Sequence, residues 1–280
     1  MNYFTLPLED WTNDFVYTYL IPIFGGFFDL IRGIISFFIN GVADLFTFIP
    51  AEIMALILVI LAWKFAGKGV AIFTVLGALY LGSVNLWDGA MLTLAVVVVA
   101  TLFSIVIGIP LGILTAKNKT LDAIVRPILD FMQTLPSFVY LIPAILLFGL
   151  GEVPAVISTF VFATPPAVRM TSLGIKQVPT DMVEAARAFG STPWQMLTKV
   201  QLPIAIPTIM AGVNQTIMLA LSMAVIASMI GAPGLGSTVL AGISSVNVGK
   251  GLVGGLGIVV LAIILDRITQ GLGNTKKRKG

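Results

Sequence analysis

Apolar runs take up most of this 280-residue chain, and they restrict its fold more than any other feature of the sequence. Hydrophobic residues make up 58% of the chain and charged residues 10%, whereas soluble domains carry about 25% charged residues. A globule of this composition would have too few charges to cover its surface, so we expect an all-α, polytopic membrane protein. The seven predicted spans are residues 51–66, 69–83, 88–116, 134–150, 153–174, 204–230 and 251–271. The first two are short for a hydrocarbon core of about 30 Å, so their boundaries stay open.

Residues 1–50 follow a different pattern. Between residues 25 and 48, polar residues recur at spacings of three and four, which places them along one stripe of a helix. A spanning helix would carry charges through the bilayer at about 2.5 kcal/mol or more each near its centre. An amphipathic helix lying in the interface avoids that penalty, so we expect one here, with a buried spanning helix as the alternative. The stripe consists of Asp29, Arg32, Ser36, Asn40 and Asp44.

Basic residues fall in alternate loops between the predicted spans, and cytoplasmic loops are the ones enriched in Lys and Arg. The loops at 85–88 and 151–152 contain neither residue type, and the segment 231–250 contains only Lys250. Seven spans in the cell membrane then place the amino terminus outside and the basic tail, residues 272–280, in the cytoplasm. The basic loop residues are Lys64, Lys68, Lys117, Lys119, Arg126, Arg169, Lys176, Arg187 and Lys199.

Several chemistries lack their usual residues in this sequence. The chain has no cysteine and no histidine, which excludes disulfides and thiol catalysis and removes the commonest general base and metal ligand. No glycine-rich phosphate loop ending in Gly-Lys-Ser/Thr occurs, so ATP binding of the P-loop kind is not expected. We expect no catalytic residue, metal site or cofactor in this chain, and the net charge of +3 gives no reason to expect a nucleic-acid partner.

Residues 180–203 form the only long polar interval between strongly apolar segments, so we expect this interval to lie in water. Residues 181–188 are rich in good helix formers, and Thr180 is placed to cap them. Gly190 can end that helix in a left-handed conformation, and Pro193 can start a second helix. A compact helix–turn–helix of this kind is typical of a docking surface.

The same interval resembles the EAA loop of the membrane subunits of binding-protein-dependent ABC importers. The resemblance rests on the tripeptide at 184–186, on Gly190 four residues later and on the Leu-Pro pair at 202–203, while Val200 stands where the family usually has isoleucine. In that family the loop forms a coupling helix that sits in a groove of the ATPase subunit. The resemblance therefore implies ATPase-coupling roles for Glu184, Ala185, Ala186, Gly190, Leu202 and Pro203.

Two further segments, 133–144 and 231–237, resemble the glycine betaine and proline betaine branch of this family. The prolines of the first segment free carbonyl groups that need partners inside a bilayer, so the segment either lines a water-filled path or is a structural kink. The glycine–proline break at 231–237 fits an external gate or a re-entrant turn. Arg169, at the inner end of a span, is expected to snorkel to the headgroups rather than to contact substrate.

A zwitterionic methylammonium solute needs cation–π or carbonyl contacts more than a salt bridge. By residue type alone, the substrate path is expected to include Phe138, Tyr140, Asn214 and Met223, with ordinary helix packing as the alternative.

The resemblance implies a type I ABC importer fold and a non-catalytic permease for a compatible solute, glycine betaine first, with carnitine, choline or proline as alternatives. It also implies a homodimer of this chain, two copies of a separate ATPase that binds ATP and magnesium, and an extracytoplasmic solute-binding protein. Without the resemblance, composition and spacing predict only a polytopic transporter with a docking loop. A self-sufficient secondary transporter would have inverted repeats and functional intramembrane charges, neither of which is clear. A membrane enzyme is disfavoured by the missing acid–base residues.

Overall fold

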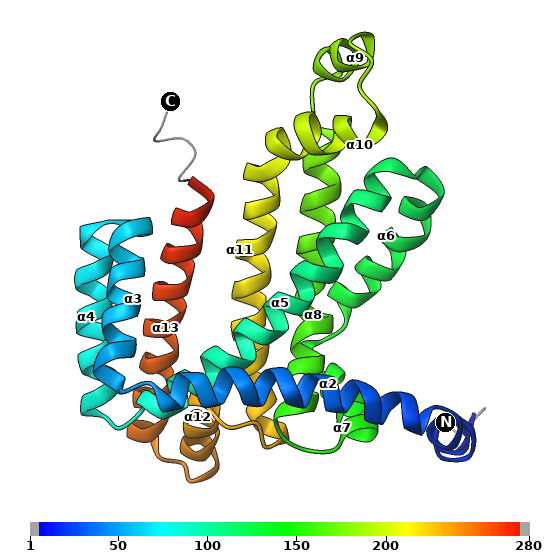
Figure 1. Cartoon of the computed structure of the whole chain (residues 1–280). Coiled ribbons are helices and arrows are strands. Elements are labelled where there is room, and N and C mark those ends of the chain that lie inside the picture. The colour runs from blue at the N-terminus through cyan, green and yellow to red at the C-terminus, as the bar shows by residue number, and fades with distance from the viewer. Residues whose placement is uncertain (1–5, 275–280) are drawn as a thin grey trace, which may run out of the picture.

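The computed structural model describes residues 6–274, and all the regular elements among them are helices. Figure 1 shows one set of helices running between two ends of the molecule, with α9 (Thr180–Ala188) at one end, which we call the loop end. The opposite end carries α2 (Ile21–Phe48), α7 (Leu141–Phe148) and α12 (Leu235–Ser244). The lengthwise helices are α3 (Ala51–Ala66), α4 (Lys68–Ser83), α5 (Trp87–Lys117), α6 (Lys119–Thr134), α8 (Glu152–Lys176), α11 (Leu202–Ile226) and α13 (Val248–Asn274).

By length and composition, five helical stretches of the described residues can cross a membrane, or six if a bent pair is counted as one span. Six of the seven predicted runs coincide with helices. The turn between α3 and α4 lies at Gly67, whose φ of +93° few other residues adopt. Each of these two helices has 16 residues, or about 24 Å at 1.5 Å per residue, so they are short for a bilayer.

The predicted span at 134–150 is wrong as a single helix. The chain runs from the loop end along α6, bends by 108°, and continues through the short helix η2 (Ser137–Tyr140) into α7. The break falls at Leu135, which is extended (φ −67°, ψ 134°) because a residue before a proline avoids the helical region. The start of α6 is set by Asn118, whose side chain accepts hydrogen bonds from the amides of Thr120 and Leu121 at 2.9 and 3.1 Å.

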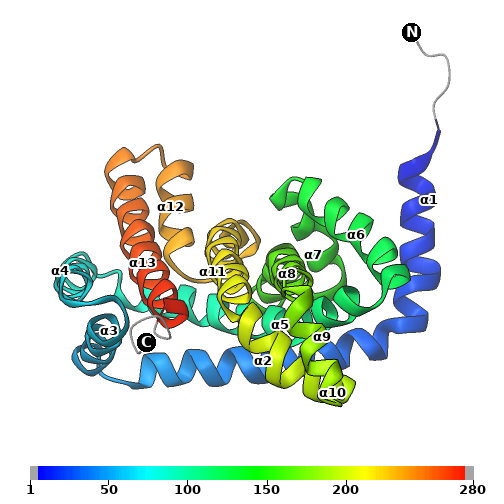
Figure 2. The ribbon, with the colours of Figure 1, turned by 90° about the horizontal axis from the view of Figure 1, so that it is seen from above.

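Helix α2 lies crosswise to the lengthwise helices and passes along one side of the bundle (Figures 1 and 2), where it packs against α5, α7 and α8. Three kinds of residue occupy three faces of α2. Ile35, Ile39 and Ala43 are buried against the bundle. The predicted polar stripe forms a second face, on which only Ser36 is half-buried and the other four residues are exposed. A third, exposed and apolar face is formed by Ile23, Phe27, Leu30, Ile34, Phe37, Leu45 and Phe48.

Close contact between α5 and α8 holds the centre of the fold together. Gly108 and Gly112 are four residues apart, and a Cβ at these positions would lie 2.8 Å from Ala167 Cβ and 2.6 Å from the Val168 carbonyl oxygen. Small residues at this spacing let the backbones of two membrane helices approach. Thr164 of α8 donates a hydrogen bond of 3.1 Å to the hydroxyl of Ser104 on α5, which adds a polar tie.

The glycine–proline break at 231–237 leads into α12, which folds back beside α13. Gly231 and Gly234 have φ of +83° and +136°, so both positions need glycine. The amide of Leu235 donates a 2.9 Å hydrogen bond to the hydroxyl of Thr93 on α5. The break is therefore a turn that starts a short helix and is anchored to the bundle.

Candidate functional site

The interval 180–203 projects from the bundle at the loop end (Figure 1) and begins with the predicted short helix, α9. The prediction that Thr180 caps this helix is wrong, because Pro179 is the N-cap residue and Thr180 is already helical. Proline fits this position because its missing N–H would have no partner inside the helix. No side-chain hydrogen bond caps this end of α9.

The carboxyl end of α9 is closed as predicted by Gly190, whose φ is +77°. The amide of Gly190 donates to the Arg187 carbonyl at 2.9 Å, and the amide of Ser191 donates to the Ala186 carbonyl at 3.0 Å. This pair of hydrogen bonds is a Schellman motif, which satisfies the last carbonyls of the helix and needs a left-handed residue. A Cβ at Gly190 would meet no atom within 4 Å, so its backbone conformation alone requires glycine.

The second helix of the interval starts at Pro193, as predicted, with α10 (Pro193–Gln195) continuing through η3 (Met196–Gln201) into α11. Its start is a capping box, in which the Gln195 amide donates to the Thr192 hydroxyl (3.3 Å) and the Thr192 amide donates to the Gln195 side-chain oxygen (2.9 Å). The spacing Thr-x-x-Gln is visible in the sequence and would have predicted this start. Two local motifs therefore fix the path of the chain between α9 and α11.

Helix α9 has two faces of opposite character. Its outward face is apolar, with Met182 50% exposed and Phe189, just after the last turn, 90% exposed. Ala185 lies on the same side at helical spacing and is exposed, while Ala186 beside it is half-buried. The other face lines a hollow of about 560 Å³ between α9 and the ends of α5, α8 and α10. That hollow is lined from α9 by Thr180, Val183, Glu184 and Arg187, and from neighbouring helices by Lys117 and Lys176 among others.

The six residues predicted to couple to the ATPase therefore do not share one surface of the loop. Ala185 belongs to the exposed face of α9, Glu184 lies on the hollow side, and Gly190 closes the helix. Leu202 is partly buried and packs with Leu197, Ile175 and Ala205, which fastens the returning chain to the bundle. Pro203 is exposed in the first turn of α11, directly after the π-helical stretch η3.

The four residues predicted for the substrate path do not form a single site, because Asn214 lies apart from Tyr140 and Met223. Phe138 on η2 is 57% exposed, whereas Tyr140 is buried and its hydroxyl donates to the Met132 carbonyl. Met223 is fully buried and shares a cluster with Tyr140. Asn214 lies nearer to the start of α11, where its side-chain amide donates to Asp266 at 3.1 Å and its oxygen accepts from Thr269 at 2.5 Å, both on α13.

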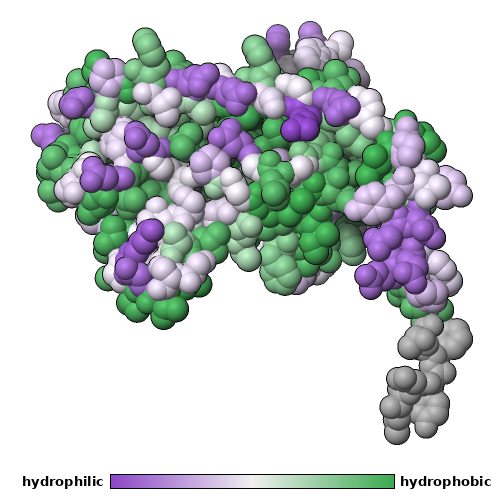
Figure 3. All heavy atoms as spheres, turned by 90° about the horizontal axis from the view of Figure 1, so that it is seen from below, coloured by the Kyte–Doolittle hydropathy of each residue, from purple (hydrophilic) through white to green (hydrophobic). Residues whose placement is uncertain are grey.

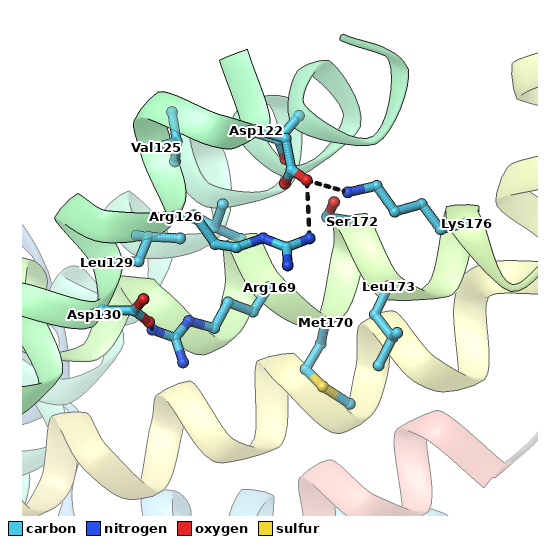
Figure 4. A pocket seen from close by; sticks show the side chains of 12 residues that line it. Asp122, Val125, Arg126, Leu129, Asp130, Arg169, Met170, Ser172, Leu173 and Lys176 are labelled. Carbon is cyan, nitrogen blue, oxygen red and sulfur yellow. Dashed lines mark hydrogen bonds and ion pairs between the residues drawn. The ribbon is translucent and has the colours of Figure 1, made fainter. Parts of the chain in front are cut away.

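A ladder of ion pairs joins α6 to α8 near the loop end (Figure 4). Asp122 accepts from Lys176 and from Arg126, each at 2.8 Å, and Asp130 accepts from Arg169. The guanidinium group of Arg169 is thus paired with a carboxylate of the neighbouring helix α6, while its predicted snorkelling to the headgroups stays a prediction. The signal in the sequence was the i, i+4, i+8 spacing of Asp122, Arg126 and Asp130 on α6, a segment that we interpreted as part of a loop.

Among residues 6–274, no three acidic, histidine or cysteine side chains gather where they could hold a metal ion. The distinctive chemical feature of this end is a rigid loop with an exposed apolar surface.

Comparison with known proteins agrees with this geometry. The family described as "binding-protein-dependent transport system inner membrane component" matches residues 108–277. The glycine betaine/proline betaine permease ProW of Escherichia coli is 49% identical over 98% of this chain and 77% of its own length. The glycine betaine permease OpuAB of Bacillus subtilis is also 49% identical, over 98% of this chain and 97% of its own length. The glycine betaine/carnitine permease GbuB of Listeria monocytogenes is 47% identical over 98% of both chains.

Among solved structures, a chain of the MetNI methionine ABC transporter in an inward-facing form has a TM-score of 0.58 and 28% identity, over 68% of this chain and 93% of its own length. The family model begins at residue 108, so α1 (Leu8–Asp14) to α4 lie outside it. The structural match over 68% of the chain shows a core like that of an ABC importer permease, while the curated relatives match 98% of the chain, amino-terminal helices included. The chain belongs to the family of binding-protein-dependent transport system inner membrane components, the membrane-spanning permease subunits of ABC transporters.

Proposed function

We propose that this protein is the permease subunit of an ATP-driven importer for glycine betaine. The observation that carries the proposal is the structured loop at 180–203, with its exposed apolar face, in a chain 49% identical to two permeases named for glycine betaine transport. Family membership favours an ATP-driven subunit over a self-sufficient secondary transporter. The test of this function is ATP-dependent uptake of glycine betaine by the reconstituted complex, compared with uptake of carnitine, choline and proline.

In this proposal the permease itself hydrolyses no ATP, and a separate ATPase subunit binds ATP and magnesium. A homodimer of this chain would carry two copies of that ATPase at its loop ends, and an extracytoplasmic solute-binding protein would deliver the substrate at the opposite end. The apolar face of α9 supports the docking step, since an exposed phenylalanine beside small alanines can enter a groove closely. Burial of one such side chain stabilises a complex by about 1.5–3 kcal/mol.

Replacement of Phe189 by alanine should weaken binding of the ATPase subunit. Loss of an apolar anchor costs about 2 kcal/mol, or about 30-fold in affinity. Co-purification of the ATPase with the permease variant measures this loss, and the matched control is Leu150→Ala, an apolar residue 73% exposed at the opposite end. Equal recovery of the ATPase with wild type and with Phe189→Ala would exclude this face of α9 as the docking surface.

We propose that the loop end faces the cytoplasm. The loop end carries Lys64, Lys68, Lys117 and Lys176, whereas acidic residues predominate at the end formed by α2, α7 and α12. Figure 3 views that second end and shows hydrophilic side chains gathered over α1, at the lower right of the view. Glu9, Asp10 and Asp14 are exposed there. The three faces of α2 support an interfacial position, with the bundle, lipid and water each meeting one face.

Single cysteines test this orientation, because the natural chain has none. Asn2, the position that we would choose from the sequence, lies outside the described residues, so we choose Thr12 on α1, which is exposed. Thr12→Cys should react with an impermeant maleimide in intact cells, and Thr192→Cys, in the loop, only after the membrane is permeabilised. The reverse pattern would invert the topology.

The substrate path remains a proposal at Phe138, Tyr140, Asn214 and Met223. Phe138 is the exposed member, and its ring could contact a quaternary ammonium group directly. Tyr140 and Met223 are buried, so their contribution would be to support η2 and α11.

A further inference from the structure

A groove of about 550 Å³ lies between α6 and α8, close to the loop end (Figure 4). Its charged residues are three cations and two carboxylates, which alternate along the groove. Its walls also include apolar side chains, among them Val125 and Leu129 of α6 and Leu173 of α8. Lys176, in the last turn of α8, lies four residues before α9, so the groove directly adjoins the loop.

The ion pairs give both carboxylates of this groove a partner, but they leave some of its hydrogen-bond donors without one. Within residues 6–274, the buried Nε of Arg169 and the hydroxyl of Ser172 have no hydrogen-bond partner. Ser172 is only 7% exposed, and it lines the groove on the side of α8 that faces α6 (Figure 4). Ion pairs that only hold α6 against α8 would need neither the Nε of Arg169 nor the hydroxyl of Ser172. Buried donors without partners are uncommon and unfavourable, so a ligand that accepts two hydrogen bonds fits this position.

The alternating charges restrict what that ligand can be. A simple anion would gain from Arg169 but would also meet the two nearby carboxylates, Asp122 and Asp130. A zwitterion matches both signs, because its carboxylate can accept from the free donors while its cationic group lies towards an aspartate. The apolar walls suit the methyl groups of a quaternary ammonium ion, which form no hydrogen bonds.

We propose that the α6–α8 groove is a binding site for a small zwitterion, whose carboxylate accepts hydrogen bonds from Arg169 Nε and the Ser172 hydroxyl and whose cationic group faces Asp130. This inference rests on the proposed function. It adds a second substrate-binding site at the loop end of the substrate path, next to the loop that meets the ATPase. Substrate bound there would be in contact with α8, which only the three residues 177–179 separate from α9.

Saturation-transfer NMR on the complete transporter in lipid nanodiscs, observing the methyl protons of glycine betaine, tests this site. Ser172→Ala should weaken binding about tenfold or more, because hydrogen bonds to a charged acceptor are the strong class. Arg169→Lys, which keeps the positive charge but removes the Nε donor, should act in the same direction. The matched control is Ser83→Ala, at the other end of the molecule, whose hydroxyl is already bonded to the Tyr80 carbonyl at 2.8 Å.

Choline, which lacks the carboxylate, and trimethylacetate, which lacks the cation, should both give much weaker signals than glycine betaine. Equal binding of glycine betaine to wild type, Ser172→Ala and Arg169→Lys would overturn the site. A lipid phosphate in the groove would also overturn the proposal. It would be shown by two results together: loss of the betaine signal in nanodiscs rich in phosphatidylglycerol, and retention of more of that lipid by wild type than by Ser172→Ala. If wild-type uptake of glycine betaine is normal while binding is unaffected by the variants, only this inference fails; if wild type takes up none, the proposed function fails.

Discussion

Gly190→Val should abolish coupled transport while leaving the membrane-spanning part of the protein folded. The φ of +77° at this position strains any residue with a side chain by about 1–2 kcal/mol, and a β-branched residue more. The strain would break the Schellman motif that ends α9, so the helix would lose its orientation towards the ATPase. Because no atom lies within 4 Å of a Cβ at this position, the substitution should not disturb the bundle.

ATP-driven uptake in proteoliposomes should fall at least about tenfold, which corresponds to a loss of about 1.4 kcal/mol. The matched control is Gly190→Asn, since asparagine tolerates the left-handed conformation and should retain most of the uptake. Thermal unfolding of Gly190→Val in detergent should be close to that of wild type. Uptake by Gly190→Val at the wild-type rate would remove the coupling role of this loop.

Gly112→Val should have the largest effect on the folded state. Its Cβ would lie 2.6 Å from the carbonyl oxygen of Val168, and backbone atoms cannot move aside as a flexible side chain can. Helices α5 and α8 would have to separate along their shared interface, and overpacking of this kind costs about 1–3 kcal/mol or more. We expect little folded protein, and a clearly lowered unfolding temperature for what is recovered in detergent.

Gly255→Val on α13 is the matched control, because a Cβ there meets nothing within 4 Å. Gly108→Ala should be milder than Gly112→Val, since its Cβ would press on the Ala167 side chain, not on a carbonyl group. Size-exclusion chromatography after a series of heating steps measures all three variants. Identical thermal stability of Gly112→Val and Gly255→Val would contradict the close approach of α5 and α8.

The sequence predicted the parts of the fold whose signals are local. Long apolar runs located α5, α8, α11 and α13, glycine located the turn at Gly190, and proline located the helix start at Pro193. We did not predict helix α6, because its charged residues indicated a loop in water and not a helix packed against the bundle. Their partners on α8 are 39 and 54 residues away, at Arg169 and Lys176, and no local pattern indicates such pairs.

The candidate site was predicted unevenly for the same reason. Helix α9, its glycine end and the start at Pro193 follow from residue types and spacing. The direction that each side chain of α9 faces depends on how the loop folds back on η3 and on the ends of α5 and α8. The ties of Asn214 to α13 and of Tyr140 to Met132 likewise form only in the folded chain, so residue type alone could not assign these residues to the path or to packing.

The most direct test of the account is uptake of radiolabelled glycine betaine into proteoliposomes that contain this permease, with its ATPase subunit and ATP on the side of the loop end and its solute-binding protein on the other. We expect accumulation that requires ATP and all three proteins, and that is not matched by carnitine, choline or proline. Accumulation by the permease alone, without ATP or the ATPase, would contradict the account.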